Sequence, residues 1–209
     1  NIEYTVKVSE SAEKYSYAKQ TTAGNASIPP TIIYGNFRIV ELDGVKVYIP
    51  SDINVNKEAL DYVVSCIISA YNYYTKIYGK SVLSEDLKLF FLNRRGGYTF
   101  QDGIILSQKY ISADTVIHDD LVKLISHEIA HLWWGIGVKT KSWSIAEGLA
   151  ELSSDLYLME KEQRNSKSIY SYKNSMVLDS NMKPEDIENL SLFNANYRTI
   201  AYNKLPIIF

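Results

Sequence analysis

The sequence predicts an α+β fold in which strands come first, a mixed region follows and helices dominate the last part. Three observations carry this prediction. From Ile2 to Val8 apolar residues alternate with polar ones, which is typical of a half-buried strand. The dipeptide Asp43-Gly44 separates strand-like runs at 32–42 and 45–49 and predicts a two-residue hairpin turn. Further along the chain, apolar residues recur at helical spacing over long stretches.

The remaining elements are assigned from periodicity and from the residues that flank each run. The first expected helix begins after Asn56, a suitable N-cap, and ends at Gly79. Tyr71, Tyr74 and Tyr78 share a face of this helix, where packing is favoured over an aromatic binding site. The other expected elements are helices at 115–134 and 142–162, strands at 87–92 and 103–107, a helical turn at 184–186 and a further helix from about residue 195.

The composition is that of an ordinary globular protein of 209 residues, 46% hydrophobic and 22% charged, which can bury a core. The net charge is −2, with Lys+Arg 22 against Asp+Glu 24 and no basic stripe, so no binding of nucleic acid is expected. No stretch reaches the roughly 18 apolar residues of a membrane span, so no membrane contact is expected within this sequence. Both ends interrupt a pattern, which indicates a piece of a longer chain and leaves the compartment and the oligomeric state open.

The strongest chemical signal is His127-Glu128-Ile129-Ala130-His131, an H-E-x-x-H motif on a predicted helix. Residues four apart on a helix point the same way, so both imidazoles can bind one Zn²⁺ ion. Glu128 is then suited to act as a general base toward a water molecule at the metal. The chain has only three His residues. Two of them in this motif, on an apolar-periodic helix, favour a zinc site over a core or surface role.

A catalytic zinc site needs a third protein ligand and an open position. Glu147 lies on the next predicted helix among apolar neighbours and can return to the metal from there, whereas the alternative is a solvated helix charge. Glu151 follows one helical turn later on the same face, where a carboxylate can orient a ligand histidine. A surface or salt-bridged carboxylate is the alternative interpretation of Glu151.

The run from His127 to Gly135, HEIAHLWWG, followed by Glu147-Gly148-Leu149-Ala150-Glu151, resembles the gluzincin zinc metallopeptidases of the aminopeptidase N and leukotriene hydrolase family. The resemblance implies a thermolysin-like catalytic domain at 51–209, a small mixed sheet with helices, truncated at its C-terminal end. It implies that residues 1–50 are the end of an N-terminal β domain. It also implies one Zn²⁺ ion, with His127, His131 and Glu147 as ligands and Glu128 as general base.

The family also carries a catalytic Tyr in a Tyr-x-Lys context, which Tyr202-Asn203-Lys204 matches. In that role Tyr202 would donate a hydrogen bond to the developing oxyanion, although a packing role is the alternative in a chain with 17 Tyr residues. The exopeptidase strand of the family corresponds to residues 96–100, where Thr99 stands in place of the Glu that binds the free amine of the substrate. The strand, with Gly96, Gly97 and Tyr98, is still expected to bind a peptide backbone by strand addition.

These features predict a zinc-dependent metallopeptidase of the aminopeptidase N kind, which hydrolyses bonds in a peptide substrate. The missing amine-binding Glu favours, as an alternative, an endopeptidase or a hydrolase of a non-peptide substrate at the same zinc site. A zinc-bearing scaffold without turnover is the alternative from a different class of protein. The side-chain preference of the substrate stays open, because the walls of the binding site cannot be identified from the sequence.

Overall fold

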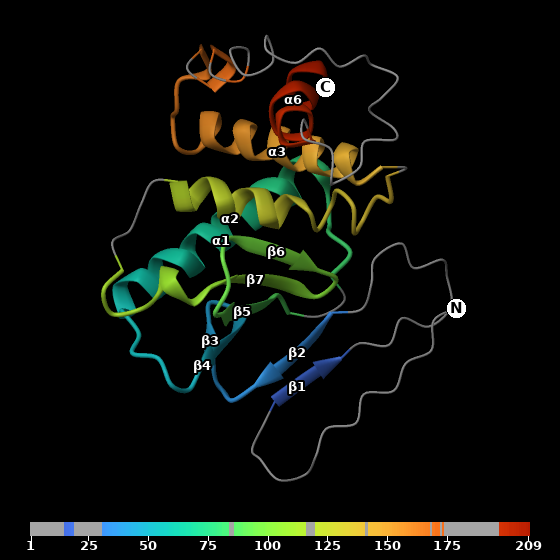
Figure 1. The fold of residues 1–209 in the computed structure, drawn as a ribbon. Helices are drawn as coiled ribbons and strands as arrows, with labels where there is room; N and C mark the ends of the chain where they lie inside the picture. The colour runs from blue at the N-terminus through green and yellow to red at the C-terminus, as the bar shows by residue number, and fades with distance from the viewer. Residues whose placement is uncertain are drawn as a thin grey trace.

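A computed structural model describes residues 15–18, 31–83, 86–115, 120–140, 142–167, 169–171, 173 and 197–209. Two sheets and a group of helices make up this part of the chain (Figure 1). β1 (Tyr15–Ala18) and β2 (Ile32–Gly35) form an antiparallel pair. The larger sheet has the strand order β3-β4-β5-β7-β6. Its strands are β3 (Phe37–Leu42), β4 (Val45–Pro50), β5 (Lys88–Leu92), β6 (Gly97–Phe100) and β7 (Gly103–Ser107).

The turn between β3 and β4 confirms the predicted hairpin. Asp43 and Gly44 have φ angles of 49° and 80°, and a type I′ turn needs a positive φ at both central residues. The run predicted at 32–42 is divided, because β2 pairs with β1 and β3 pairs with β4. The chain leaves the smaller sheet at Asn36, whose carbonyl accepts a hydrogen bond from Ser51 N at 3.1 Å.

The larger sheet is mixed, as the resemblance implies. β4, β5 and β7 run parallel to one another, whereas β3 and β6 run antiparallel to their neighbours. Val47 is paired with Leu89, so the sheet includes strands on both sides of residue 50. The strands β3 and β4, which lie before residue 51, therefore belong to the same sheet as β5, β6 and β7. The division of the chain into domains and the thermolysin-like detail of the fold stay predictions.

The two faces of the sheet carry different cores because side chains alternate along each strand. Leu89 and Phe91 of β5 belong to the large core that the sheet shares with the helices. Phe90 belongs to a smaller core on the opposite face, where its ring stacks on Tyr48 with 4.0 Å between the centroids. Helices α1, α2 and α3 lie in layers over the first face (Figure 1). The edge strand β6 contacts α2.

Helix α1 (Lys57–Tyr78) begins and ends where the sequence predicts. The Asn56 side chain accepts a hydrogen bond from Ala59 N at 3.1 Å, and Gly79 has a φ of 82° beyond the last turn. The face with Tyr71, Tyr74 and Tyr78 is a packing face, as expected, because all three rings contact Trp133, with 5.5, 5.8 and 6.4 Å between the centroids.

Helix α2 (Asp120–Ala130) ends four residues before the end of the predicted helix at 115–134. Tighter bonds replace the helical pattern at its end, with Leu132 N donating to Ile129 O at 3.1 Å and Trp133 N donating to Ala130 O at 3.0 Å. Gly135 then adopts a φ of 97°, which turns the chain back toward α3. α3 (Trp143–Glu160) begins at its N-cap Ser142 and agrees with the prediction.

The end of the chain is helical, as predicted from about residue 195. It comprises α5 (Tyr197–Thr199), the π-helical segment η3 (Ile200–Lys204) and α6 (Leu205–Ile208). The short 3₁₀ helix η1 (Gln108–Tyr110) follows β7. The strand predicted at 2–8 and the helical turn predicted at 184–186 lie outside the described residues. Among the helices described here, none has the length and apolar character needed to cross a membrane.

Candidate metal centre

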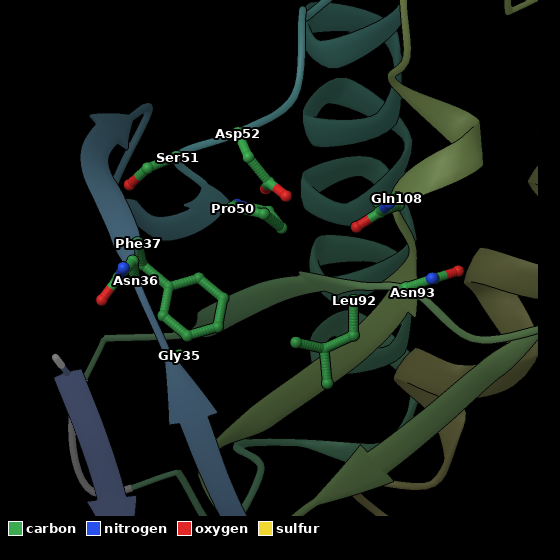
Figure 2. A pocket seen from close by; sticks show the side chains of 9 residues that line it. All are labelled: Gly35, Asn36, Phe37, Pro50, Ser51, Asp52, Leu92, Asn93 and Gln108. Carbon is green, nitrogen blue, oxygen red and sulfur yellow. The ribbon is translucent and has the colours of Figure 1, made fainter.

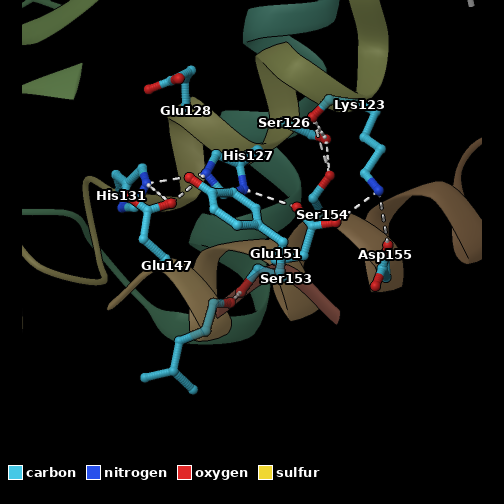
Figure 3. A network of polar contacts seen from close by, with 12 residues as sticks. Lys123, Ser126, His127, Glu128, His131, Glu147, Glu151, Ser153, Ser154 and Asp155 are labelled. Atoms are coloured by element: carbon cyan, nitrogen blue, oxygen red, sulfur yellow. Dashed lines mark hydrogen bonds and ion pairs between the residues drawn. The ribbon is translucent and has the colours of Figure 1, made fainter. Parts of the chain in front are cut away.

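Three buried side chains, from α2, from the turn that follows it and from α3, converge on one point (Figure 3). His127 lies on α2 and His131 is the first residue after its end, and their Nε2 atoms are 3.2 Å from each other. Glu147 comes from the first half of α3, with its Oε2 atom 3.2 Å from Nε2 of His127 and 3.6 Å from Nε2 of His131. All three residues are less than 8% exposed.

The spacing of these atoms fits a zinc ion. Ligand atoms at the corners of a tetrahedron around Zn²⁺, with bonds of about 2.0–2.1 Å, lie about 3.3–3.4 Å apart. Two imidazole nitrogens and one carboxylate oxygen are also a donor set that zinc commonly accepts. His127, His131 and Glu147 therefore form a group that could hold a metal ion.

Small side chains let the two ligand helices approach each other. Ser126 on α2 and Ser154 on α3 lie side by side, with their hydroxyl oxygens 2.7 Å apart. Gly148, next to Glu147, has no room for a side chain, because a Cβ there would lie 2.6 Å from Cβ of Leu205. The position of Glu147 thus depends on close packing of α3 against both α2 and the helical end of the chain.

Each histidine is oriented by a second acceptor on its other ring nitrogen. Nδ1 of His127 lies 3.1 Å from Oε2 of Glu151, and Nδ1 of His131 lies 3.1 Å from the carbonyl oxygen of Trp134. Carboxylates and carbonyls only accept hydrogen bonds, so Nδ1 carries a proton in both rings. Nε2 is then the nitrogen of each ring that faces a metal.

The acidic neighbours also set the charges of the site. Burial alone lowers the pKa of His127, but the hydrogen bonds with Glu147 and Glu151 outweigh it and raise the pKa to about 10. Burial raises the pKa of Glu147. Hydrogen bonds with the two histidines and their charges outweigh this effect and hold the pKa well below its usual value. Without a metal ion, His127 therefore carries a proton that a metal has to displace.

Glu151 also belongs to a buried charge cluster behind His127. Oε1 of Glu151 lies 2.7 Å from Nζ of Lys123 and 2.9 Å from Nζ of Lys173. Lys173 is 1% exposed and also contacts Oδ2 of Asp155 at 2.8 Å. Despite burial, the bond with His127 and the charge of Lys123 hold the pKa of Glu151 well below its usual value.

Tyr202 lies beside the metal-ligand group. Its ring stacks on the ring of His127 with 5.6 Å between the centroids. Burial, followed by the charge of Glu147 and a hydrogen bond to it, holds the pKa of Tyr202 well above its usual value, so its hydroxyl stays protonated. Lys173 Nζ donates to the carbonyl of Tyr202 at 2.8 Å and joins this residue to the charge cluster. The hydroxyl of Tyr197 is buried and has no hydrogen-bond partner among the described residues.

Glu128 contacts β6 rather than the three converging side chains. Oε2 of Glu128 lies 2.7 Å from Oγ1 of Thr99. A Cβ at Gly97 would lie 2.5 Å from Cγ of Glu128, so only glycine leaves space for this carboxylate. Tyr98 packs against the smaller core on the other face of the sheet, so the structure does not bring its side chain to the site. Gly96, with a φ of 67°, forms the bend that leads into β6.

Three contributors to the site were not predicted in their present roles. Lys123 lies four residues before His127 on α2, so helical spacing could have indicated it. Trp143 stacks on His131 with 5.6 Å between the centroids, and its exposure of 37% leaves part of the ring open to a ligand. Lys173 has no signal in the sequence, because only the folded chain brings it to Glu151 and Asp155 of α3.

A cavity of about 380 Å³ lies at the carboxyl ends of β4 and β5 (Figure 2). It contains none of the predicted site residues. Its lining combines polar side chains with one aromatic ring and is made by Gly35, Asn36, Phe37, Pro50, Ser51, Asp52, Leu92, Asn93 and Gln108.

No protein-family model matches the chain, and no curated protein matches it either. Solved structures of other proteins do match the chain. An aminopeptidase N family protein from Idiomarina loihiensis matches with a TM-score of 0.59 and 12% identity, over 93% of this chain and 42% of that chain. An M1 zinc metallopeptidase from Deinococcus radiodurans matches with a TM-score of 0.49 and 13% identity, over 91% of this chain and 48% of that chain. The chain thus spans less than half the length of these two proteins, and the first likeness shows that it shares the fold of part of an aminopeptidase N family protein.

Proposed function

We propose that this chain is the catalytic portion of a zinc-dependent peptidase of the aminopeptidase N kind. The observation that carries the proposal is the buried group of His127, His131 and Glu147, whose ligand atoms lie at the mutual distances of a zinc site. A purely structural zinc site would use four protein ligands. The described residues offer three, which leaves one position for a substrate or water.

The ion would be held by His127, His131 and Glu147. When bound, zinc supplies Lewis acidity, which lowers the pKa of water to about 7 and polarises a carbonyl oxygen. Glu128 would take the proton from the attacking water and pass it to the leaving amine nitrogen. Tyr202 would donate a hydrogen bond from its protonated hydroxyl to the oxyanion that develops on the scissile carbonyl. The raised pKa of Tyr202 supports this role, because the proton is retained at neutral pH.

The substrate would be a peptide that adds a strand to the edge of β6 with which no other described strand pairs. β6 is the last strand of the sheet and runs directly beside α2, which carries Glu128. Strand addition supplies main-chain hydrogen bonds, and these bonds hold an extended peptide without requiring a particular side chain. The exposed part of Trp143 beside His131 is a second surface that such a peptide would contact.

Cleavage of internal peptide bonds is the second candidate activity. β6 has the sequence GYTF and carries no carboxylate that could bind a free amine. Thr99, which stands in the family's amine-binding position, directs its hydroxyl to Glu128 instead. This contact favours substrates whose recognition does not depend on a free N-terminus.

Digestion of matched free and N-acetylated peptides by the zinc-loaded protein, read by mass spectrometry, tests the proposal. Removal of residues from free termini alone would establish an aminopeptidase, and internal cuts in both peptides would establish an endopeptidase. Absence of cleavage of either peptide by the zinc-loaded protein would contradict the peptidase proposal and favour a zinc scaffold.

A further inference from the structure

Thr99 joins the edge strand of the sheet to Glu128. Its hydroxyl oxygen lies 2.7 Å from Oε2 of Glu128 and 2.6 Å from the carbonyl oxygen of the same residue. Thr99 is 5% exposed and Glu128 is 7% exposed, so water competes little for this contact. The neighbouring Gly97 provides the space in which the Glu128 carboxylate lies.

The hydroxyl of Thr99 has a single proton to donate, although two acceptors lie within reach. An ionised carboxylate is the stronger acceptor, because hydrogen bonds to charged groups are shorter and about twice as strong as neutral ones. The hydroxyl of Thr99 therefore donates its hydrogen bond to Oε2 when Glu128 is ionised. This hydrogen bond fixes the rotation of the carboxylate.

The backbone of Thr99 faces the edge of β6 with which no other described strand pairs. Ser107 N donates to Gly96 O across the β6–β7 pair at 3.1 Å, and hydrogen-bonded pairs alternate along antiparallel strands. The backbone groups of Gly97 and Thr99 therefore point away from β7. A contact of Arg94 agrees with this orientation. Its Nη2 donates to the carbonyl of Gly97 at 3.3 Å, so this carbonyl is directed away from β7. A peptide that adds to this edge would bind the same residue that holds Glu128.

We propose that Thr99 is a positioning residue, which holds the Glu128 carboxylate in register with a peptide bound along β6. The inference rests on the proposed function, in which Glu128 is the general base. The residue takes the place of an amine-binding carboxylate and acts on proton transfer instead of on recognition of a terminus. Its loss should therefore affect turnover more than binding of the substrate.

Thr99→Val keeps the shape of the side chain and removes the hydroxyl. In the zinc-loaded protein we expect a 10- to 100-fold lower kcat, roughly the effect of removing an orienting contact around a metal site, with little change in KM. Thr99→Ser, which restores the hydroxyl, should recover most of the lost kcat. Thr75→Val is the matched control, because Thr75 Oγ1 has no hydrogen-bond partner among the described residues. A kcat for Thr99→Val equal to that of the control would overturn the proposal.

A double-mutant cycle in the metal-free protein tests the contact without any assay of activity. Urea unfolding of Thr99→Val, Glu128→Met and the double variant should show non-additive effects, with a coupling of at least about twofold in the unfolding equilibrium constant. Additive effects would mean that the hydroxyl serves only the backbone carbonyl, and the positioning role would be lost. Coupling together with an unchanged kcat would leave the peptidase proposal standing and overturn the role of Thr99. A wild-type protein that cleaves no peptide would overturn the proposed function itself and, with it, the positioning role.

Discussion

Nδ1 of His127 lies 3.1 Å from Oε2 of Glu151, one helical turn beyond Glu147 on α3. One helix thus supplies both a ligand of the proposed metal and the carboxylate that orients another ligand. The relative register of α2 and α3 sets both contacts together. Packing between α2 and α3 therefore determines the geometry of the metal site. Substitution of a residue that orients a ligand, such as Glu151, should affect metal binding.

Glu151→Gln should weaken zinc binding. The change keeps the size of the side chain but removes the charge that holds the Nδ1 proton of His127, and loss of such a contact typically costs 10- to 100-fold in metal affinity. Competition with a fluorescent chelator measures the affinity. Glu160→Gln, on the exposed end of α3, is the control and should bind zinc like the wild type. Equal affinities of the two variants would show that Glu151 does not orient His127.

Lys173→Met should lower the free energy of unfolding by about 3–5 kcal/mol, because it leaves Glu151 and Asp155 buried with one fewer cation. The variant also removes the hydrogen bond to the carbonyl of Tyr202. Urea unfolding followed by circular dichroism measures the change. Lys167→Met removes an exposed lysine as the matched control and should have little effect. A loss for Lys173→Met no larger than for this control would contradict the assigned network.

Tyr202→Phe should reduce kcat by about 100- to 1,000-fold, the usual cost of removing one donor to a developing oxyanion. Zinc content should stay at the wild-type level, because Tyr202 is not one of the three proposed ligands. Steady-state kinetics together with metal analysis separates the two effects. A variant with wild-type kcat would return Tyr202 to a packing role against His127.

The metal-free protein should lose stability as pH rises toward about 10. The pKa of His127 is raised from 6.5 to about 10 in the folded protein, so its contribution is complete below pH 6.5 and disappears as pH passes through the folded value. The affinity of the protein for zinc should instead rise with pH over the same window, because zinc displaces this proton. Calorimetric titrations with zinc in buffers of different ionisation enthalpy count the released protons. Absence of proton release at pH 7 would contradict a protonated His127.

Elements defined by local signals could be predicted from the sequence. The Asp43-Gly44 turn and the caps of α1 at Asn56 and Gly79 each depend on residues a few positions apart. The convergence of His127 and His131 could be predicted from their spacing of four residues, although α2 itself ends at Ala130. The end of α2 was missed because periodicity extends beyond Ala130, whereas a tight turn and the positive φ of Gly135 end the helix there.

Contacts that depend on packing across the fold could not be predicted. Parallel pairing of β4 with β5 connects strands separated by the whole of α1, and no local pattern encodes it. The contact between Thr99 and Glu128 depends on the side of β6 that faces α2. Lys173 reaches Glu151 only after the chain has folded back against α3. In each case the residue type was visible in the sequence, but its partner was not.

The most direct test of the account is turnover of one extended peptide by the wild type and by Glu128→Gln, each with its zinc content measured on the same sample. The account predicts one zinc per chain in both proteins, cleavage by the wild type and none by the variant, because the ligands are intact and the proton acceptor is gone. Equal cleavage by both proteins, or a wild type that binds no zinc, would contradict it.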